Sequence, residues 1–240
     1  ETLYLVGDVI DMWRLRQKWR WPQAHNEVVR RILKMVKEGT RVVFIPGNHD
    51  EHARQYAGLR FGGVEVRNES EHWTADGRRL LITHGDQFDL VVKHARLVSM
   101  LGSWGYDTLI AINHYYNVGR RSLGMRYWSL SKAIKGRVKT ACTFIAKFEQ
   151  TLMDEARRRG FDGVVCGHIH KAEIRRGDID YFNCGDWVES CTALVEHEDG
   201  AIRIVDGLAF IESLEEGRMP ANAVVATTPA TESDQDLISA

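Results

Sequence analysis

Short apolar runs recur toward both ends of the sequence, and each one stops at glycine or polar residues. Runs of this length that are rich in β-branched residues are typical of buried strands. The clearest lie at residues 2–6, 41–46, 79–83 and 163–166. Weaker patterns predict further strands at 64–66, near 72–73, at 179–183 and, as a hairpin around Asp199-Gly200, at 193–197 and 201–205.

Helical spacing of apolar residues occurs in two parts of the chain. The first predicts a helix that Asn26 caps and Gly39 ends. The second, residues 90–160, is basic and aromatic and interrupts the strand pattern, so we interpret it as an inserted helical cap. From about residue 215 no apolar period remains, which predicts a disordered tail. The predicted domains are therefore a core of residues 1–89 and 161–214, the cap of 90–160 and the tail of 215–240.

Composition narrows the class of protein. The chain has 240 residues and a net charge of −1, so its overall charge does not favour nucleic acid as a partner. The four cysteines form no Cys-x-x-Cys pair and predict reduced thiols in a cytoplasmic protein. No uninterrupted apolar stretch reaches the length of a transmembrane helix, and no signal peptide is visible.

Residues of the kinds that bind metals follow four of the predicted strands. Each of these sequences, taken singly, is an ordinary polar turn, but together they indicate one site at the carboxyl edge of a sheet. Carboxylate, amide and imidazole ligands suit Mn, Fe or Zn, whereas calcium prefers oxygen ligands alone. The residues are Asp8 with Asp11, Asn48 with His49, His84, and His168 with His170.

The two histidines of Gly167-His168-x-His170 can diverge in a turn and reach two different ions. The carboxylate of Asp8 can bridge two cations. Two ions about 3.5–4 Å apart would clamp the attacking and leaving oxygens of a displacement at phosphorus. The pattern therefore favours a two-metal phosphoryl-transfer site.

Four short sequences carry a resemblance to a known family: Gly7-Asp8-x-x-Asp11, Gly47-Asn48-His49-Asp50, Thr83-His84-Gly85-Asp86 and Gly167-His168-x-His170. In order and approximate spacing across residues 3–207 they resemble the calcineurin-like metallophosphoesterases. Trp13, the basic insertion and residues 183–190 resemble, within that family, the UDP-2,3-diacylglucosamine diphosphatase branch of lipid A biosynthesis. The resemblance implies an α/β protein with an α/β/β/α sandwich of mixed sheets and an inserted helical cap.

The resemblance also implies roles for these residues. Asp8 would bridge two divalent ions, most simply Mn with Fe or Zn as alternatives. Asn48, His84 and His168 would complete one metal site, and His170 would bind the other ion. His49, oriented by Asp11, would act as general acid or transition-state stabiliser while a metal-bound hydroxide attacks phosphorus.

Two features depart from the family pattern. The family opens with an Asp-x-His sequence on its first strand, but none precedes Asp8 here. Because the chain starts at Glu1 within a predicted strand, we expect that this first strand has been lost by truncation, which leaves the His170 site weak. The lipid A branch tends to carry arginine where His49 stands, so the reaction class is better supported than the substrate.

The predicted cap supplies cations and aromatic rings for a substrate. A solvated basic helix face would have the same composition, but guanidinium groups also bind diphosphates well, and a basic amphipathic cap favours an anionic membrane surface. The candidate substrate-binding residues are Trp13, Arg120, Arg121, Arg126, Trp128, Lys132, Lys135 and Lys139.

The sequence thus predicts a metal-dependent pyrophosphohydrolase that cleaves a UDP-linked diacylated sugar to UMP and a lipid monophosphate. We expect it in the cytoplasm, with peripheral contact to the inner face of the membrane. Two alternatives remain open. One is a general phosphodiesterase or phosphatase for nucleotides or phosphoproteins, and the other is a catalytically impaired scaffold of the same fold.

Overall fold

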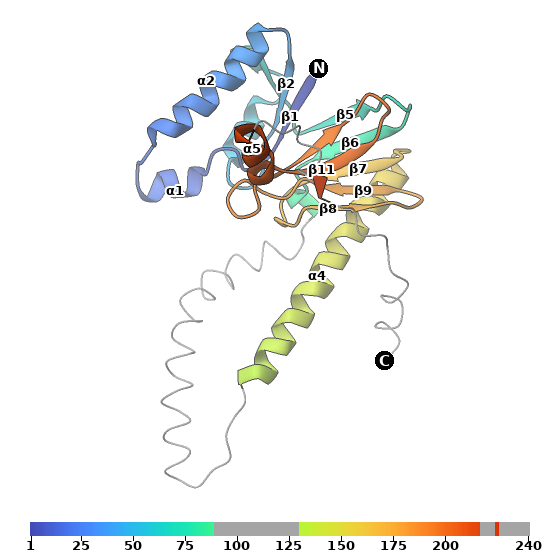
Figure 1. The fold of residues 1–240 in the computed structure, drawn as a ribbon. Coiled ribbons are helices and arrows are strands. Elements are labelled where there is room, and N and C mark those ends of the chain that lie inside the picture. Colours follow the sequence, from blue (N-terminus) through green and yellow to red (C-terminus); the bar gives the residue numbers. More distant parts are fainter. Residues whose placement is uncertain (89–129, 217–223, 226–240) are drawn as a thin grey trace, which may run out of the picture. The chain divides into compact units, whose positions relative to one another are not determined.

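The computed structural model describes residues 1–88, 130–216 and 224–225, and these form the coloured elements of Figure 1. The chain divides into two units, one of residues 1–86 with 152–240 and the other of residues 87–151. All strands of the described residues lie in the first unit. The predicted division into core, cap and tail stays a prediction, because much of the cap and nearly all of the tail lie outside the described residues.

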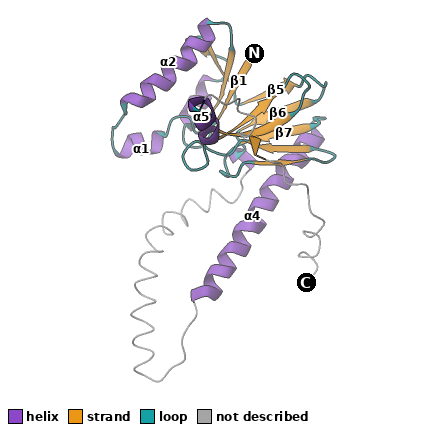
Figure 2. Ribbon diagram, viewed as in Figure 1, coloured by secondary structure: helices purple, strands orange, loops and turns teal. Residues whose placement is uncertain are grey.

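Two mixed sheets form the centre of the first unit. One has the order β1-β2-β4-β3, and the other has the order β5-β6-β7-β9-β8. Their strands are orange in Figure 2. The bounds are β1 Thr2–Val6, β2 Arg41–Ile45, β3 Arg60–Phe61, β4 Val64–Val66, β5 Glu69–Trp73, β6 Arg79–Thr83, β7 Gly163–Cys166, β8 Glu173–Arg175 and β9 Asp180–Asn183.

Parallel pairing of the strands determines at which edge of each sheet the following loops lie. Strand β1 runs parallel to β2 with Val6 opposite Ile45, so both strands end at the same edge. In the second sheet β6, β7 and β9 are parallel neighbours, with Ile82 opposite Val165. The loops that follow β1 and β2, and those that follow β6, β7 and β9, therefore lie at the carboxyl edges of the two sheets. This is the edge where ligands bind in open α/β sheets.

A third, antiparallel sheet consists of β10 Thr192–Glu196, β11 Ile202–Asp206 and β12 Val224–Val225. Its side chains share one apolar cluster with the other two sheets. The buried members of that cluster come from β2, β6, β8, β9 and β11: Val43, Ile45, Leu80, Ile82, Ile174, Phe182, Ile202 and Ile204. Because one core joins all three sheets, they stabilise one another, and the mixed α/β class predicted from the sequence is confirmed.

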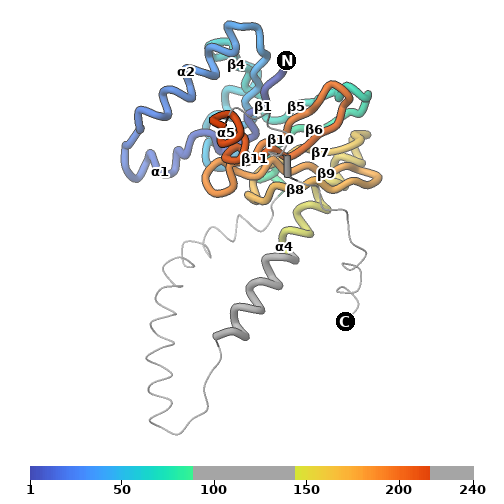
Figure 3. Tube along the Cα trace, viewed as in Figure 1, coloured from blue at the N-terminus to red at the C-terminus, as the bar shows by residue number. Residues whose placement is uncertain are grey.

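The helices are purple in Figure 2, and Figure 3 follows the chain through them. None in the described part of the chain is long and apolar enough to cross a membrane. Their bounds are α1 Met12–Gln17, α2 Gln23–Lys37, the 3-10 turns η1 Glu51–Tyr56 and η2 Asp86–Phe88, α4 Leu130–Arg158 and α5 Gly207–Glu215.

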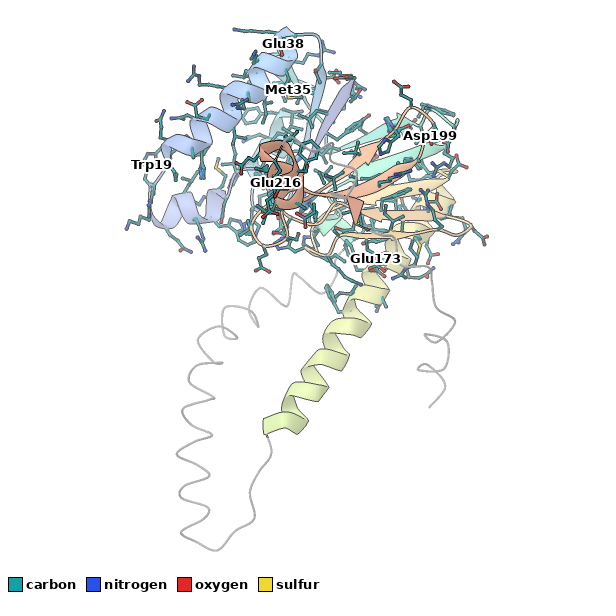
Figure 4. The ribbon with its side chains drawn as sticks, viewed as in Figure 1. Trp19, Met35, Glu38, Glu173, Asp199 and Glu216 are labelled. Atoms are coloured by element: carbon teal, nitrogen blue, oxygen red, sulfur yellow. The ribbon has the colours of Figure 1, made fainter. Side chains whose placement is uncertain are left out.

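One predicted helix start is wrong. Helix α2 begins at Gln23 after Pro22, so Asn26 lies inside the helix, where its side chain accepts a hydrogen bond from the Trp21 indole. The segment before Pro22 also contains the short helix α1, which the sequence did not predict because its apolar residues show no helical period. Trp19, between the two helices, is 84% exposed and is labelled in Figure 4.

A carboxylate surrounded by three arginines stabilises the first sheet. Glu65 on β4 is 7% exposed and accepts hydrogen bonds from Arg41 (3.1 Å), Arg60 (3.0 Å) and Arg67 (2.9 Å). The hydrogen bond from Arg41 is the largest effect on the pKa of Glu65 and, although burial opposes it, the arginines together lower that pKa from 4.5 to about 2. The carboxylate is therefore ionised at neutral pH.

Replacing Glu65 by glutamine is expected to lower the free energy of unfolding at pH 7 by about 1–2 kcal/mol. This value lies between the contributions of surface and of buried ion pairs, because the arginines are half exposed. A folded-state pKa below the unfolded value gives stability that is complete above pH 4.5 and lost as the pH falls toward 2. Urea unfolding at pH 7 and about pH 2.5 should show the difference shrinking in acid. Glu71→Gln, at an exposed pair with Arg79, is the control, and an equal loss at both pH values would contradict the assignment.

Candidate metal centre

The strand ends bring the predicted ligands together. Asp8 follows β1, Asn48 follows β2, His84 follows β6 and His168 follows β7. The Nε2 atom of His84 lies 3.4 Å from the Asp8 carboxylate and 3.3 Å from the Asn48 amide oxygen. That same amide oxygen lies 3.1 Å from Nδ1 of His168. Four residues that follow strands of two sheets are therefore joined by contacts from Asp8 through His84 and Asn48 to His168.

The hydrogen bonding of His84 shows that this cluster suits a cation. Its Nδ1 lies 3.1 Å from the carbonyl oxygen of Val6, which can only accept, so Nδ1 carries a proton. Its Nε2 then faces the oxygens of Asp8 and Asn48, which are both acceptors. Three acceptors that face one another need a further proton or a metal ion between them, and an imidazole oriented through its other nitrogen is the usual metal ligand.

Asp8 and His84 shift each other's pKa. Burial alone would raise the pKa of Asp8, but the hydrogen bond and charge of His84, with the N–H of His49, lower it to about 2. Burial alone would lower the pKa of His84, but Asp8 raises it above its ordinary value. Asp8 is therefore an anionic ligand at neutral pH, and a divalent cation would compete with protons for Nε2 of His84.

The donor types fit a borderline divalent ion, but the described part of the chain holds no preformed cage. Within residues 1–88, 130–216 and 224–225, no group of three or more His, Cys, Asp or Glu side chains is arranged to hold an ion. The cluster depends on the amide of Asn48, which lies outside those four residue types. The residues that would hold an ion are thus Asp8, Asn48, His84 and His168.

Glycine allows the strand ends to approach this closely. A Cβ atom on Gly47 would lie 2.3 Å from the Asp8 carboxylate and 2.7 Å from Nε2 of His84. A Cβ atom on Gly7 would lie 2.0 Å from Nδ1 of His84. Two of the glycines in the metal-binding sequences are therefore needed because the side chains of Asp8 and His84 occupy the space.

Backbone strain concentrates at the same edge. Four non-glycine residues in the described ranges have positive φ, and three of them are predicted metal ligands: Asp8 (52°), His168 (69°) and His170 (54°). A left-handed conformation is unfavourable for residues with a Cβ atom, and such residues cluster at functional sites. The turns therefore orient these side chains, and the unusual conformation costs backbone energy.

His49 has the surroundings of a residue that transfers protons. Its Nδ1 lies 3.1 Å from a carboxylate oxygen of Asp11, and its ring stacks on Trp13 with centroids 4.0 Å apart. Its backbone N–H donates to the Asp8 carboxylate at 2.9 Å. With Nδ1 bound to Asp11, Nε2 remains available for a substrate. Trp13, expected to bind substrate, thus packs against the predicted catalytic histidine.

His170 shares the left-handed backbone conformation, and its predicted role at a second ion stays a prediction. The sequence Asp50-Glu51-His52, after β2, is an Asp-x-His sequence, but it does not supply the missing ligands. There the Asp50 carboxylate accepts backbone N–H groups, and His52 contacts Arg16.

Sequence reasoning gave no role to two buried polar residues beside the site. Asp50, 3% exposed, binds both ligand-bearing loops. Asn183, fully buried, donates to the carbonyl oxygen of Gly167 at 2.8 Å and so holds the turn that carries His168. Asp50 stood inside the sequence Gly-Asn-His-Asp, which was the available signal. Asn183 had a weaker one, its place at the end of a strand.

The predicted cap residues cannot be placed at the site. Arg120, Arg121, Arg126 and Trp128 lie outside the described residues. Lys132, Lys135 and Lys139 lie in helix α4. Their contact with a substrate or with a membrane surface stays a prediction.

Comparison with known proteins agrees with the chemistry of the cluster. The model of the calcineurin-like phosphoesterase family matches residues 1–172, which include Asp8, Asn48, His84 and His168. The UDP-2,3-diacylglucosamine hydrolase of Edwardsiella ictaluri (strain 93-146) is 25% identical over 192 residues. That alignment covers 77% of this chain and 69% of the relative.

Proposed function

Because this chain belongs to the calcineurin-like phosphoesterase family, we propose that it is a metal-dependent hydrolase that cleaves the diphosphate of a UDP-linked, diacylated sugar. The products would be UMP and a lipid monophosphate. The observation that supports the reaction class is one cluster of acceptor atoms that suits a cation. It is formed by Asp8, Asn48, His84 and His168. The substrate is suggested by the name of the hydrolase from Edwardsiella ictaluri.

The chain's own residues divide the work. The family generally uses divalent metal ions, which when bound would polarise the phosphoryl group. The four ligands would hold such an ion, and we favour Mn because carboxylate, amide and imidazole donors suit it. Water adds to one phosphorus of the diphosphate as the P–O bond to the other phosphate breaks.

His49 would handle the proton of that reaction. Asp11 holds Nδ1 at 3.1 Å, and the Trp13 ring covers one face of the imidazole. The free Nε2 of the protonated imidazole can then donate to the departing phosphate oxygen. No protein nucleophile is needed, since water supplies the attacking oxygen.

A direct assay tests this proposal. We expect the purified full-length protein, supplied with Mn²⁺, to release UMP from UDP-2,3-diacylglucosamine and to lose this activity after treatment with EDTA. Re-addition of Mn²⁺ should restore it. Turnover of bis-p-nitrophenyl phosphate without turnover of the lipid nucleotide would refute the substrate and leave a general phosphodiesterase. Mn²⁺ binding without any hydrolysis would refute the enzyme and favour the scaffold.

A further inference from the structure

The carboxylate of Asp50 receives four backbone N–H groups. Its Oδ1 accepts from Gly47 (2.6 Å) and from Asp8 (3.3 Å). Its Oδ2 accepts from Val9 (2.7 Å) and from Ile10 (3.2 Å). Asp50 itself is 3% exposed, so these bonds form away from water. The carboxylate is thus held by four backbone donors, with no arginine or lysine among them.

These bonds join two loops that both carry metal-ligand residues. Three donors belong to consecutive residues of the loop after β1, and the fourth belongs to the loop after β2. The Asp8 carboxylate returns a bond in the other direction, because it accepts the backbone N–H of His49. The two loops are therefore cross-linked twice, once through each carboxylate.

The same bonds hold Asp8 in its unusual conformation. Its φ of 52° is unfavourable for aspartate, and a turn of this kind aims successive N–H groups toward one side, where an anion can bind them. Asp50 is that anion. Without it, three adjacent N–H groups would lack their acceptor in the described structure, and the turn could relax toward an ordinary conformation that moves the Asp8 side chain.

We propose that Asp50 is a positioning residue that sets Asp8 and Asn48 for metal binding before any ion arrives. This inference rests on the proposed function in that it takes the cluster of Asp8, Asn48, His84 and His168 as the place where the ion binds. Asp50 does not touch that ion. It acts through the backbone of the two loops that carry Asp8 and Asn48.

The variant Asp50→Asn tests the proposal, because it preserves shape and turns one acceptor oxygen into an NH₂ donor. Whichever way the amide lies, that donor faces two backbone N–H groups. We expect the metal-depleted variant to bind Mn²⁺ about 10–100-fold more weakly in calorimetry, the usual size of an effect on ligand orientation. Its hydrolytic activity should recover when the Mn²⁺ concentration is raised, which a general loss of fold would not allow.

Asp180→Asn is the matched control. Asp180 is also buried (8% exposed) and accepts hydrogen bonds from Gly177, Arg78 and Arg176, away from the ligand-bearing loops. Its loss should lower stability without changing Mn²⁺ affinity. A folded Asp50→Asn protein with wild-type affinity would overturn the proposal, and so would an equal loss of affinity in both variants.

Amide hydrogen exchange in the metal-free wild-type protein provides a readout that needs no metal. We expect slow exchange at Gly47, Val9 and Ile10, and faster exchange at these amides in Asp50→Asn. Exchange at the rate of an unstructured peptide in the wild type would overturn the proposal. If the wild type binds no Mn²⁺ at all, the proposed function fails, and the exchange data still decide whether Asp50 orders the two loops.

Discussion

Replacing His49 by alanine is expected to lower kcat by about 10²–10⁴-fold, the range that positioned general acids contribute. The reason is the arrangement of its ring, with Nδ1 on Asp11 and one face on Trp13, which leaves Nε2 for the leaving oxygen. Mn²⁺ affinity should stay close to that of the wild type, because the cluster uses only the backbone N–H of His49, which alanine retains.

His52→Ala is the matched control for this variant. His52 lies three residues further along, is exposed and contacts Arg16 rather than the cluster. Its kcat should stay within about twofold of the wild type, as for surface substitutions away from a site. Steady-state kinetics at saturating Mn²⁺ separate the two histidines. A His49→Ala enzyme with unchanged kcat would remove the residue from the chemistry.

Gly47→Ala is expected to disrupt the metal centre by steric overlap. Its Cβ atom would meet the carboxylate of Asp8 at 2.3 Å, Nε2 of His84 at 2.7 Å and the backbone nitrogen of Asp8 at 2.8 Å. A flexible side-chain tip could move aside, but the backbone of Asp8 is held by Asp50. We expect a loss of about 1–3 kcal/mol in the free energy of unfolding, as for overpacked cores, together with weaker Mn²⁺ binding.

Gly177→Ala separates this overlap from a general effect of removing glycine. Neither Gly47 nor Gly177 has a positive φ, and a Cβ atom on Gly177 would meet only a carbonyl oxygen at 3.8 Å, an ordinary contact. Urea unfolding and Mn²⁺ calorimetry on both variants make the comparison. Equal stability and equal affinity in the two proteins would show that the loops move apart without cost.

The sequence predicted the buried strands well, because each is a short apolar run with a clear end. The ranges 79–83 and 163–166 agree with β6 and β7 residue for residue. The pattern could not show α1 or β8, which are too short to display a period. Helix α5 was also missed, since its apolar residues follow β11 directly and only Asp206, which caps it, marks the start.

The ligand types were also readable from the sequence, but their mutual contacts were not. Asn48 and His49 could be named because amide and imidazole groups at a strand end are chemically distinctive. The roles of Asp50 and Gly47 depend on backbone direction and on atoms from a strand far away in the sequence. A pattern of residue types carries no information about which N–H groups point toward one carboxylate.

The contact between Asn48 and His168 joins residues that are 120 positions apart in the sequence, and it bridges two different sheets. Closing a loop of this length costs chain entropy, which slows the formation of such contacts during folding. An ion bound there would recognise only a chain in which both sheets have already docked. It would therefore act on the rate at which the native protein opens, rather than on the rate at which it first folds.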